Sequence, residues 1–173
     1  MRMSSRSIAQ RSLAPLLAGG LLFAAACGSG DSGSSASEGA GGALISIEHA
    51  MGTTTIEAPP ERVVALDPSF SDAALLLDAP LVGYVQYRED RDNPFPDYLG
   101  DIDDVVADSV NVGTIAEPNL EQILELEPDL IISAKVRHEP LYDQLSKIAP
   151  TVFSETTGPT WKQNVVLLGE ALG

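Results

Sequence analysis

Basic residues are scarce in this chain. Its 173 residues include 10 lysines and arginines against 25 aspartates and glutamates, which gives a formal net charge of −15. A protein that binds nucleic acid needs a basic face to neutralise phosphates, so nucleic acid is excluded as a partner. We read the acidity mainly as a well-solvated surface.

Cysteine and histidine are almost absent as well. Cys27 is the single cysteine, so an internal disulfide is excluded. The two histidines, His49 and His138, lie far apart in the sequence, and a transition-metal site with several imidazoles is therefore not expected. We expect no bound cofactor and no resident metal, and we interpret His138 as a residue of a cleft rim or of the surface.

Catalytic motifs are also missing. The chain contains no G-x-S-x-G elbow, no P-loop and no metalloprotease helix. The acidic run at 101–104 lacks the spaced ligands and the glycine of a calcium loop, and is better explained as a solvated face. An extracellular α/β enzyme, such as a hydrolase, is the alternative class, and the missing motifs favour a protein that performs no chemistry.

Long apolar runs are confined to the N-terminus. Residues 1–12 are basic and polar, and residues 13–26 are apolar but interrupted by Pro15 and Gly19. This stretch is too short for a membrane-spanning helix and is typical of a secretory signal over residues 1–26. Without it, the chain would keep 7 basic and 25 acidic residues.

The signal ends in Ala24-Ala25-Ala26-Cys27, which resembles a bacterial lipobox. In a lipobox the cysteine is lipidated, although Ala24 stands here where leucine is usual. Residues 27–43 are rich in glycine and serine and are expected to form a flexible tether. We therefore predict lipidation at Cys27 and an extracytoplasmic protein attached to the membrane through a lipid anchor. Ordinary cleavage that leaves a free thiol is the alternative.

From residue 44 onward, strand and helix patterns alternate. Residues 44–49 and 53–57 predict a β-hairpin. Apolar runs predict buried strands at 62–66 and 130–132 and further strands at 81–85, 110–113 and 151–153. Helical patterns are found at 69–77, 97–100, 120–125, 141–148 and 160–173. This order predicts an α/β domain with a layered, mostly parallel sheet flanked by helices.

Helix starts are marked by residues that can cap them. Ser69, Asn119 and Thr160 each stand where a helical pattern begins, and a suitable partner follows three residues later. The last helix carries an apolar stripe that includes Val165 and Leu168. The segment between the strand at 130–132 and the helix at 141–148 is polar, and we expect it to be a loop.

Four stretches of the sequence, in this order behind a lipoprotein signal, resemble the iron-siderophore substrate-binding proteins of ABC importers. They are ERVVALDPSFSDAALLLDAPLVGYV, VGTIAEPNLEQILELEPDLIIS, YDQLSKIAPTVF and WKQNVVLLGEALG. The family also contains cobalamin- and haem-binding members. The resemblance implies two α/β lobes joined by a long helix, with the ligand in a cleft between them.

The resemblance covers residues 62 to 173, which correspond to one lobe only. It implies that residues 44–159 form the N-terminal lobe and that residues 160–173 begin the interlobe helix, with the C-terminal lobe absent. We therefore expect a fragment or a truncated protein. A transport-inactive lobe that acts only as a surface interaction lipoprotein is the competing hypothesis, and it predicts an exposed apolar stripe on the last helix.

Ligands of open α/β sheets bind at the carboxyl ends of the strands. Of the seven basic residues after the signal, four follow such ends: Arg88, Arg91, Lys135 and Arg137. Arginine suits the carboxylate, hydroxamate or catecholate oxygens of a ferric siderophore. The predicted ligand contacts are Phe70, Tyr87, Arg88, Lys135 and Arg137. The alternative is that these are scattered, solvated side chains.

Glu121 has a separate role by resemblance. In the family, a glutamate after an Asn-Leu turn docks into an arginine pocket on the permease, and Asn119-Leu120-Glu121 matches that turn. The helix dipole alone also favours a carboxylate in a first helical turn. The expected partners are thus an ABC transporter permease, a ferric siderophore and the membrane.

Overall fold

Five parallel strands form the central sheet of the protein. The computed structural model describes residues 44–87 and 95–173, which belong to one unit of the chain. The strands are β3 (Val63–Ala65), β4 (Leu81–Gln86), β5 (Val110–Thr114), β6 (Leu130–Ala134) and β7 (Thr151–Ser154), in the order β5-β4-β3-β6-β7. The predicted fold class is confirmed.

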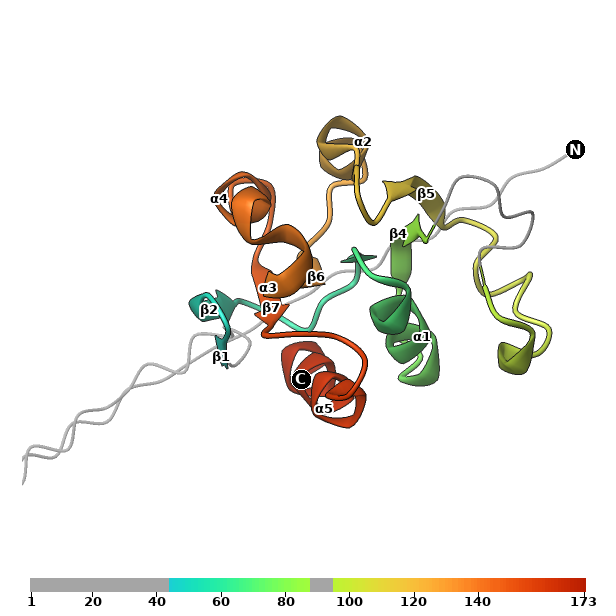
Figure 1. Cartoon of the computed structure of the whole chain (residues 1–173), viewed down its shortest axis with the longest axis horizontal. Helices are drawn as coiled ribbons and strands as arrows, with labels where there is room; N and C mark the ends of the chain where they lie inside the picture. Colours follow the sequence, from blue (N-terminus) through green and yellow to red (C-terminus); the bar gives the residue numbers. More distant parts are fainter. Residues whose placement is uncertain (1–43, 88–94) are drawn as a thin grey trace, which may run out of the picture. The chain divides into compact units, whose positions relative to one another are not determined.

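Helices cover both faces of this sheet (Figure 1). On one face lie α1 (Pro68–Leu76) and α5 (Trp161–Leu172). On the other lie α2 (Leu120–Glu125) and α4 (Tyr142–Leu145). The short α3 (Lys135–His138) and the 3₁₀ helix η2 (Glu139–Leu141) join β6 to α4, and η1 (Asp97–Leu99) lies between β4 and β5.

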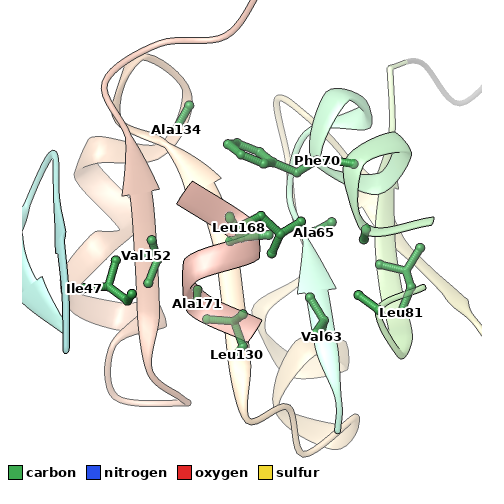
Figure 2. Close-up of a cluster of buried hydrophobic side chains, with 14 of the residues drawn as sticks. Ile47, Val63, Ala65, Phe70, Leu81, Leu130, Ala134, Val152, Leu168 and Ala171 are labelled. Atoms are coloured by element: carbon green, nitrogen blue, oxygen red, sulfur yellow. The ribbon is translucent and has the colours of Figure 1, made fainter. Parts of the chain in front are cut away.

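The strands β3, β6 and β7 are buried along their whole length, whereas β5 at the edge of the sheet is partly exposed. Along β3, Val63 and Ala65 point to the face covered by α1 and α5, while Val64 and Leu66 point to the other. Figure 2 shows Val63 and Ala65 gathered with Phe70 from α1 and with other apolar side chains of this cluster. Each large side chain removed from water contributes about 1.5–3 kcal/mol.

A β-hairpin covers the β7 edge of the sheet. It consists of β1 (Ile45–His49) and β2 (Gly52–Ile56), which pair antiparallel as predicted. The amide N of Ala50 donates to the Phe153 carbonyl at 2.9 Å, and Oγ1 of Thr54 donates to the Thr151 carbonyl at 2.8 Å. These bonds use polar groups that an edge strand would otherwise expose.

His49 links this hairpin to β7, and its ring is neutral. Its Nδ1 accepts from the amides of Met51 and Phe153, each at 3.3 Å, so the ring proton is on Nε2, which donates to Oγ1 of Thr54 at 2.9 Å. Burial lowers the pKa of His49 below its usual 6.5.

Several predicted helix ends were wrong. Helix α1 begins at Pro68, with Asp67 as its N-cap and not Ser69, because proline fits the first helical position. The hydroxyl of Thr160 does not cap α5 but donates to the Thr156 carbonyl at 3.0 Å. The predicted helix at 141–148 is shorter, with α4 spanning four residues. The Asn119 cap is confirmed: its Oδ1 accepts from the amides of Glu121 and Gln122 at 3.1 Å.

The apolar stripe of the last helix faces the core. Leu168 is fully buried, and Val165 is partly buried against the same cluster, so the exposed stripe that the competing hypothesis predicts is not found at these positions. The stripe packs on α1 and the sheet, which removes it from water. Within the described residues, no helix has the length and apolar character needed to cross a membrane.

Candidate ligand-binding site

The carboxyl ends of the parallel strands meet at one edge of the sheet, and a pocket lies there. Its volume is about 350 Å³, and it is lined by Tyr87, Ile115, Ala116, Val136 and Arg137. Tyr87 follows β4, Ile115 and Ala116 follow β5, and the other two belong to α3 after β6. The structure thus brings together two of the predicted ligand contacts, Tyr87 and Arg137, from separate strand ends.

Arg137 is anchored by two residues that do not line this pocket. Its Nε donates to Oδ2 of Asp67 at 3.1 Å, and its Nη2 donates to Oγ1 of Thr157 at 3.3 Å. The Arg137 side chain is 36% exposed, whereas that of Asp67 is only 5% exposed. A buried carboxylate therefore holds a cation that remains open to solvent.

Asp67 is itself fixed by the helix that it caps. Its Oδ1 accepts from the Ser69 amide at 3.0 Å and from the Ser69 hydroxyl at 2.6 Å. These bonds satisfy an otherwise unpaired amide at the start of α1. The first turn of α1 thus holds the Asp67 carboxylate through both the backbone and the side chain of Ser69.

Lys135 lies on the same short helix but does not line the pocket. Its Nζ is 3.8 Å from Oε1 of Glu155, whose side chain is 72% exposed. The carboxylate offsets part of the positive charge that Lys135 brings to this edge. Its predicted contact with a ligand stays a prediction.

Phe70, which was predicted as a ligand contact, does not line the pocket. It lies on α1 and is fully buried in the cluster between that helix and the sheet. The residue follows a strand end in sequence, but its position within the first helical turn directs the ring toward the core. In this structure it contributes to packing and not to the pocket surface.

His138 was wrongly placed at the surface or at a cleft rim. Its side chain is buried, with Nε2 donating to the Ile115 carbonyl at 2.7 Å and Nδ1 2.7 Å from Oγ of Ser133. A carbonyl can only accept, so the ring proton is on Nε2, and Nδ1 of the neutral ring accepts the Ser133 hydroxyl proton. His138 thereby ties the segment after β5 to α3 beneath the pocket.

Burial is the main reason that the pKa of His138 is lowered. Nearby Arg137 acts in the same direction, whereas the bond to Ile115 and the charge of Asp67 oppose it. The neutral ring is therefore the form that keeps this edge of the pocket in place.

Several predicted features lie outside the described residues. These are Arg88 and Arg91, the signal at 1–26, the tether at 27–43 and the lipidation site Cys27. Glu121 is described: it is exposed in the first turn of α2, and no ion pair to it is found in residues 44–87 and 95–173. Its proposed docking role stays a prediction.

A larger hollow of about 530 Å³ lies beside α5 and the hairpin. Its charged lining residues are Glu48, Glu155, Glu170 and Lys162, so negative charge predominates. Such a surface repels anionic ligands, and the pocket at the strand ends suits them better. In the part of the chain that the structure describes, no three His, Cys, Asp or Glu side chains are grouped to hold a metal ion.

Sequence reasoning missed Asp67 and Thr157 as parts of the site. An aspartate directly after a buried strand and before proline is a signal that could have identified Asp67 as a cap at the ligand edge. Thr157 follows β7, and nothing in its sequence context indicates a contact with Arg137.

Comparison with known proteins gives consistent matches. A family described as "Periplasmic binding protein" matches residues 63–173. "Probable siderophore-binding lipoprotein YfiY" of Bacillus subtilis is 43% identical over 153 residues, covering 88% of this chain and 45% of the relative. "Fe(3+) dicitrate-binding periplasmic protein FecB" of Escherichia coli is 34% identical over 143 residues, covering 76% of this chain and 46% of the relative.

The fold also matches solved structures. Staphylococcus aureus SirA complexed with staphyloferrin B superposes with a TM-score of 0.66 and 45% identity, covering 74% of this chain and 42% of SirA. This chain therefore spans about half the length of the relatives that it matches.

Proposed function

We propose that this chain, which belongs to the periplasmic binding protein family, contributes one face of a binding site for a ferric siderophore in an ABC importer. The relatives named above are siderophore- and ferric-citrate-binding proteins, and the family consists of solute-binding proteins. In the proposed role the protein captures the iron chelate outside the cytoplasm and presents it to the membrane permease.

The observation that carries this proposal is the pocket shared by Arg137 and Tyr87. A guanidinium at the carboxyl edge of an otherwise acidic protein offers charge-assisted hydrogen bonds to ligand oxygens. Tyr87, with 57% of its surface exposed, offers an aromatic face to the organic part of a chelate. Iron is the cargo and arrives inside its chelator, so the protein needs to recognise the chelate and not the metal.

Calorimetric titration of the chain with ferric citrate, ferric desferrioxamine B and ferric enterobactin tests this function. These probes present carboxylate, hydroxamate and catecholate oxygens. We expect saturable binding to one of the three ferric chelates. We expect no binding to the iron-free chelators of the other two classes. Haem and cobalamin are added because the family resemblance includes them, and binding to either alone would change the proposed cargo.

Docking to the permease is proposed for the surface around Glu121. The carboxylate lies in the first turn of α2, and Leu124, one turn further along, is 58% exposed. An exposed charge beside an exposed apolar side chain is suited to a specific protein contact. Glu121→Arg should leave chelate affinity unchanged and abolish stimulation of the permease ATPase, with the exposed Glu57→Arg at the end of the hairpin as the matched control.

The proposed architecture follows the family. Residues 44–159 would form the N-terminal lobe, α5 would begin the interlobe helix, and Cys27 would carry the lipid anchor. The competing proposal is a transport-inactive lobe that acts as a surface interaction lipoprotein. A well-folded chain that binds none of the five probes would favour that alternative.

A further inference from the structure

The guanidinium of Arg137 is held along one edge only. Nε and Nη2 form that edge, and they donate to Asp67 and Thr157 at 3.1 and 3.3 Å. Among the residues that the structure describes, no acceptor is bonded to Nη1. The end of the guanidinium formed by Nη1 and Nη2 therefore keeps N–H donors available on the side of the pocket.

Holding one edge matters because a free arginine is flexible. Its side chain has about 2 kcal/mol of rotamer entropy to lose when a ligand immobilises it. An arginine that is already oriented loses less of this entropy on binding, so preorganisation increases affinity. Arg137 is 36% exposed, and its guanidinium is hydrogen-bonded to Asp67 and Thr157.

Asp67 is built to provide this orientation. Its side chain is 5% exposed, and Oδ1 is committed to the amide and hydroxyl of Ser69, which leaves Oδ2 facing Arg137. Capping α1 does not require a negative charge, because asparagine is an equally good N-cap. The charge of Asp67 is therefore not explained by the cap alone, and it faces Arg137.

We infer that Asp67 is a positioning residue of the ligand site: its buried carboxylate fixes the Nε edge of Arg137, so that the opposite end is presented to the oxygens of the chelate. This inference rests on the proposed function, in which Arg137 contacts the ligand. It assigns no contact between Asp67 and the ligand itself. It also predicts that the effect of Asp67 on affinity passes entirely through Arg137.

The first test needs no ligand. In a ¹H–¹⁵N spectrum of arginine side chains, we expect a slowly exchanging Arg137 Nε–H signal, assigned by its loss in Arg137→Lys. In Asp67→Asn the Arg137 Nε–H proton should exchange rapidly with water, so that its signal disappears. The backbone amide signals should persist, which shows that the variant is folded. A signal that is absent in the wild type, or that persists unchanged in Asp67→Asn, would overturn the inference.

The second test is a double-mutant cycle with ferric citrate as the probe. Asp67→Asn should weaken binding about ten-fold in the wild-type background and have no further effect in Arg137→Ala, because the two residues act as one unit. An equal loss in both backgrounds would mean a merely structural role and would contradict the inference. Unchanged or tighter binding by Asp67→Asn would contradict it as well.

Asp129→Asn is the matched control. The carboxylate of Asp129 accepts from the amides of Glu61 and Arg62 at 2.7 and 2.8 Å, at the opposite edge of the sheet. It should alter stability without altering affinity. If the wild type binds no ferric chelate, the proposed function fails, while the Nε–H spectrum still decides whether Asp67 holds Arg137.

Discussion

Two arginines at opposite ends of the same sheet are used in opposite ways. At the amino ends of the strands, Arg62 directs its guanidinium to backbone carbonyls: Nε donates to Leu126 and Glu127 at 2.8 and 3.2 Å, and Nη2 donates to Leu126 at 2.6 Å. These carbonyls lie at the end of α2, where helical acceptors lack partners. Arg62 therefore joins the start of β3 to the end of α2.

At the carboxyl ends, Arg137 is bound by side chains and keeps donors free. Its partners are one buried carboxylate and one hydroxyl, and it lines a pocket. The comparison teaches that exposure does not separate a structural arginine from a binding one, since both are exposed in part. Both guanidinium groups bond through Nε and Nη2, and what separates them is the partner and the surroundings. Arg62 donates to backbone carbonyls at a helix end, whereas Arg137 donates to side chains and lines a pocket.

The largest effect is expected from Arg137→Ala. Loss of a charge-assisted contact of about 1.5–3 kcal/mol should weaken binding of the ferric chelate about 10- to 150-fold. Calorimetry measures the change. Retention of full affinity would remove Arg137 from the site and would erase the contrast with Arg62.

Arg62→Ala should show the reverse behaviour. It leaves carbonyls at the end of α2 without their partner, so the free energy of unfolding should fall by about 1–2 kcal/mol. Urea unfolding followed by circular dichroism measures this loss, and calorimetry should find unchanged affinity for the chelate. A folded Arg62→Ala chain with impaired binding would contradict the assignment of stability to the amino ends of the strands and of binding to their carboxyl ends.

The two histidines make stability depend on pH. The pKa of each is lowered, mainly by burial, so the folded protein favours the neutral ring. Their contribution to stability is full above pH 6.5 and decreases as the pH falls through the lowered pKa, by at most about 1.4 kcal/mol per pH unit for each ring.

Urea unfolding at pH 7.5, 6.5 and 5.5 measures this dependence. His49→Gln and His138→Gln should each reduce the slope, but only His138→Gln should also weaken chelate binding, because His138 supports the pocket and His49 the hairpin. A flat stability profile over this range would show that neither ring is held neutral.

The smallest effect is expected from Lys135→Ala. Its partner Glu155 is exposed, and such surface pairs contribute about 0–1 kcal/mol. Stability should change little, and affinity for an anionic chelate should fall about two- to three-fold at low salt, with the difference reduced at high salt. A loss as large as that of Arg137→Ala would place Lys135 in direct contact with the ligand.

The sequence predicted the layers better than the site. In an α/β domain, a short run such as Leu130-Ile131-Ile132 indicates a strand that is buried on both faces. The structure contains this strand as β6. The amphipathic pattern of α5 was equally informative, because periodicity alone specifies a helix with one buried side.

The directions of single side chains could not be predicted in the same way. Phe70 and Asp67 are three residues apart after the same strand, but the helical turn sends the ring into the core and leaves the carboxylate at the site. His138 is polar in sequence, and its burial depends on Ser133 and on the Ile115 carbonyl, which only the folded chain brings to it. Contacts between distant segments decide such cases.

The central claim is that the chelate binds at the carboxyl edge of the sheet. High-spin Fe³⁺ broadens nearby NMR signals, and the corresponding Ga³⁺ chelate provides a diamagnetic control. With a ferric chelate bound, we predict broadening of the amides of Tyr87, Ile115, Val136 and Arg137, and sharp signals at Arg62 and Asp129. Broadening centred on the amino edge, or beside α5 and the hairpin, would contradict the account.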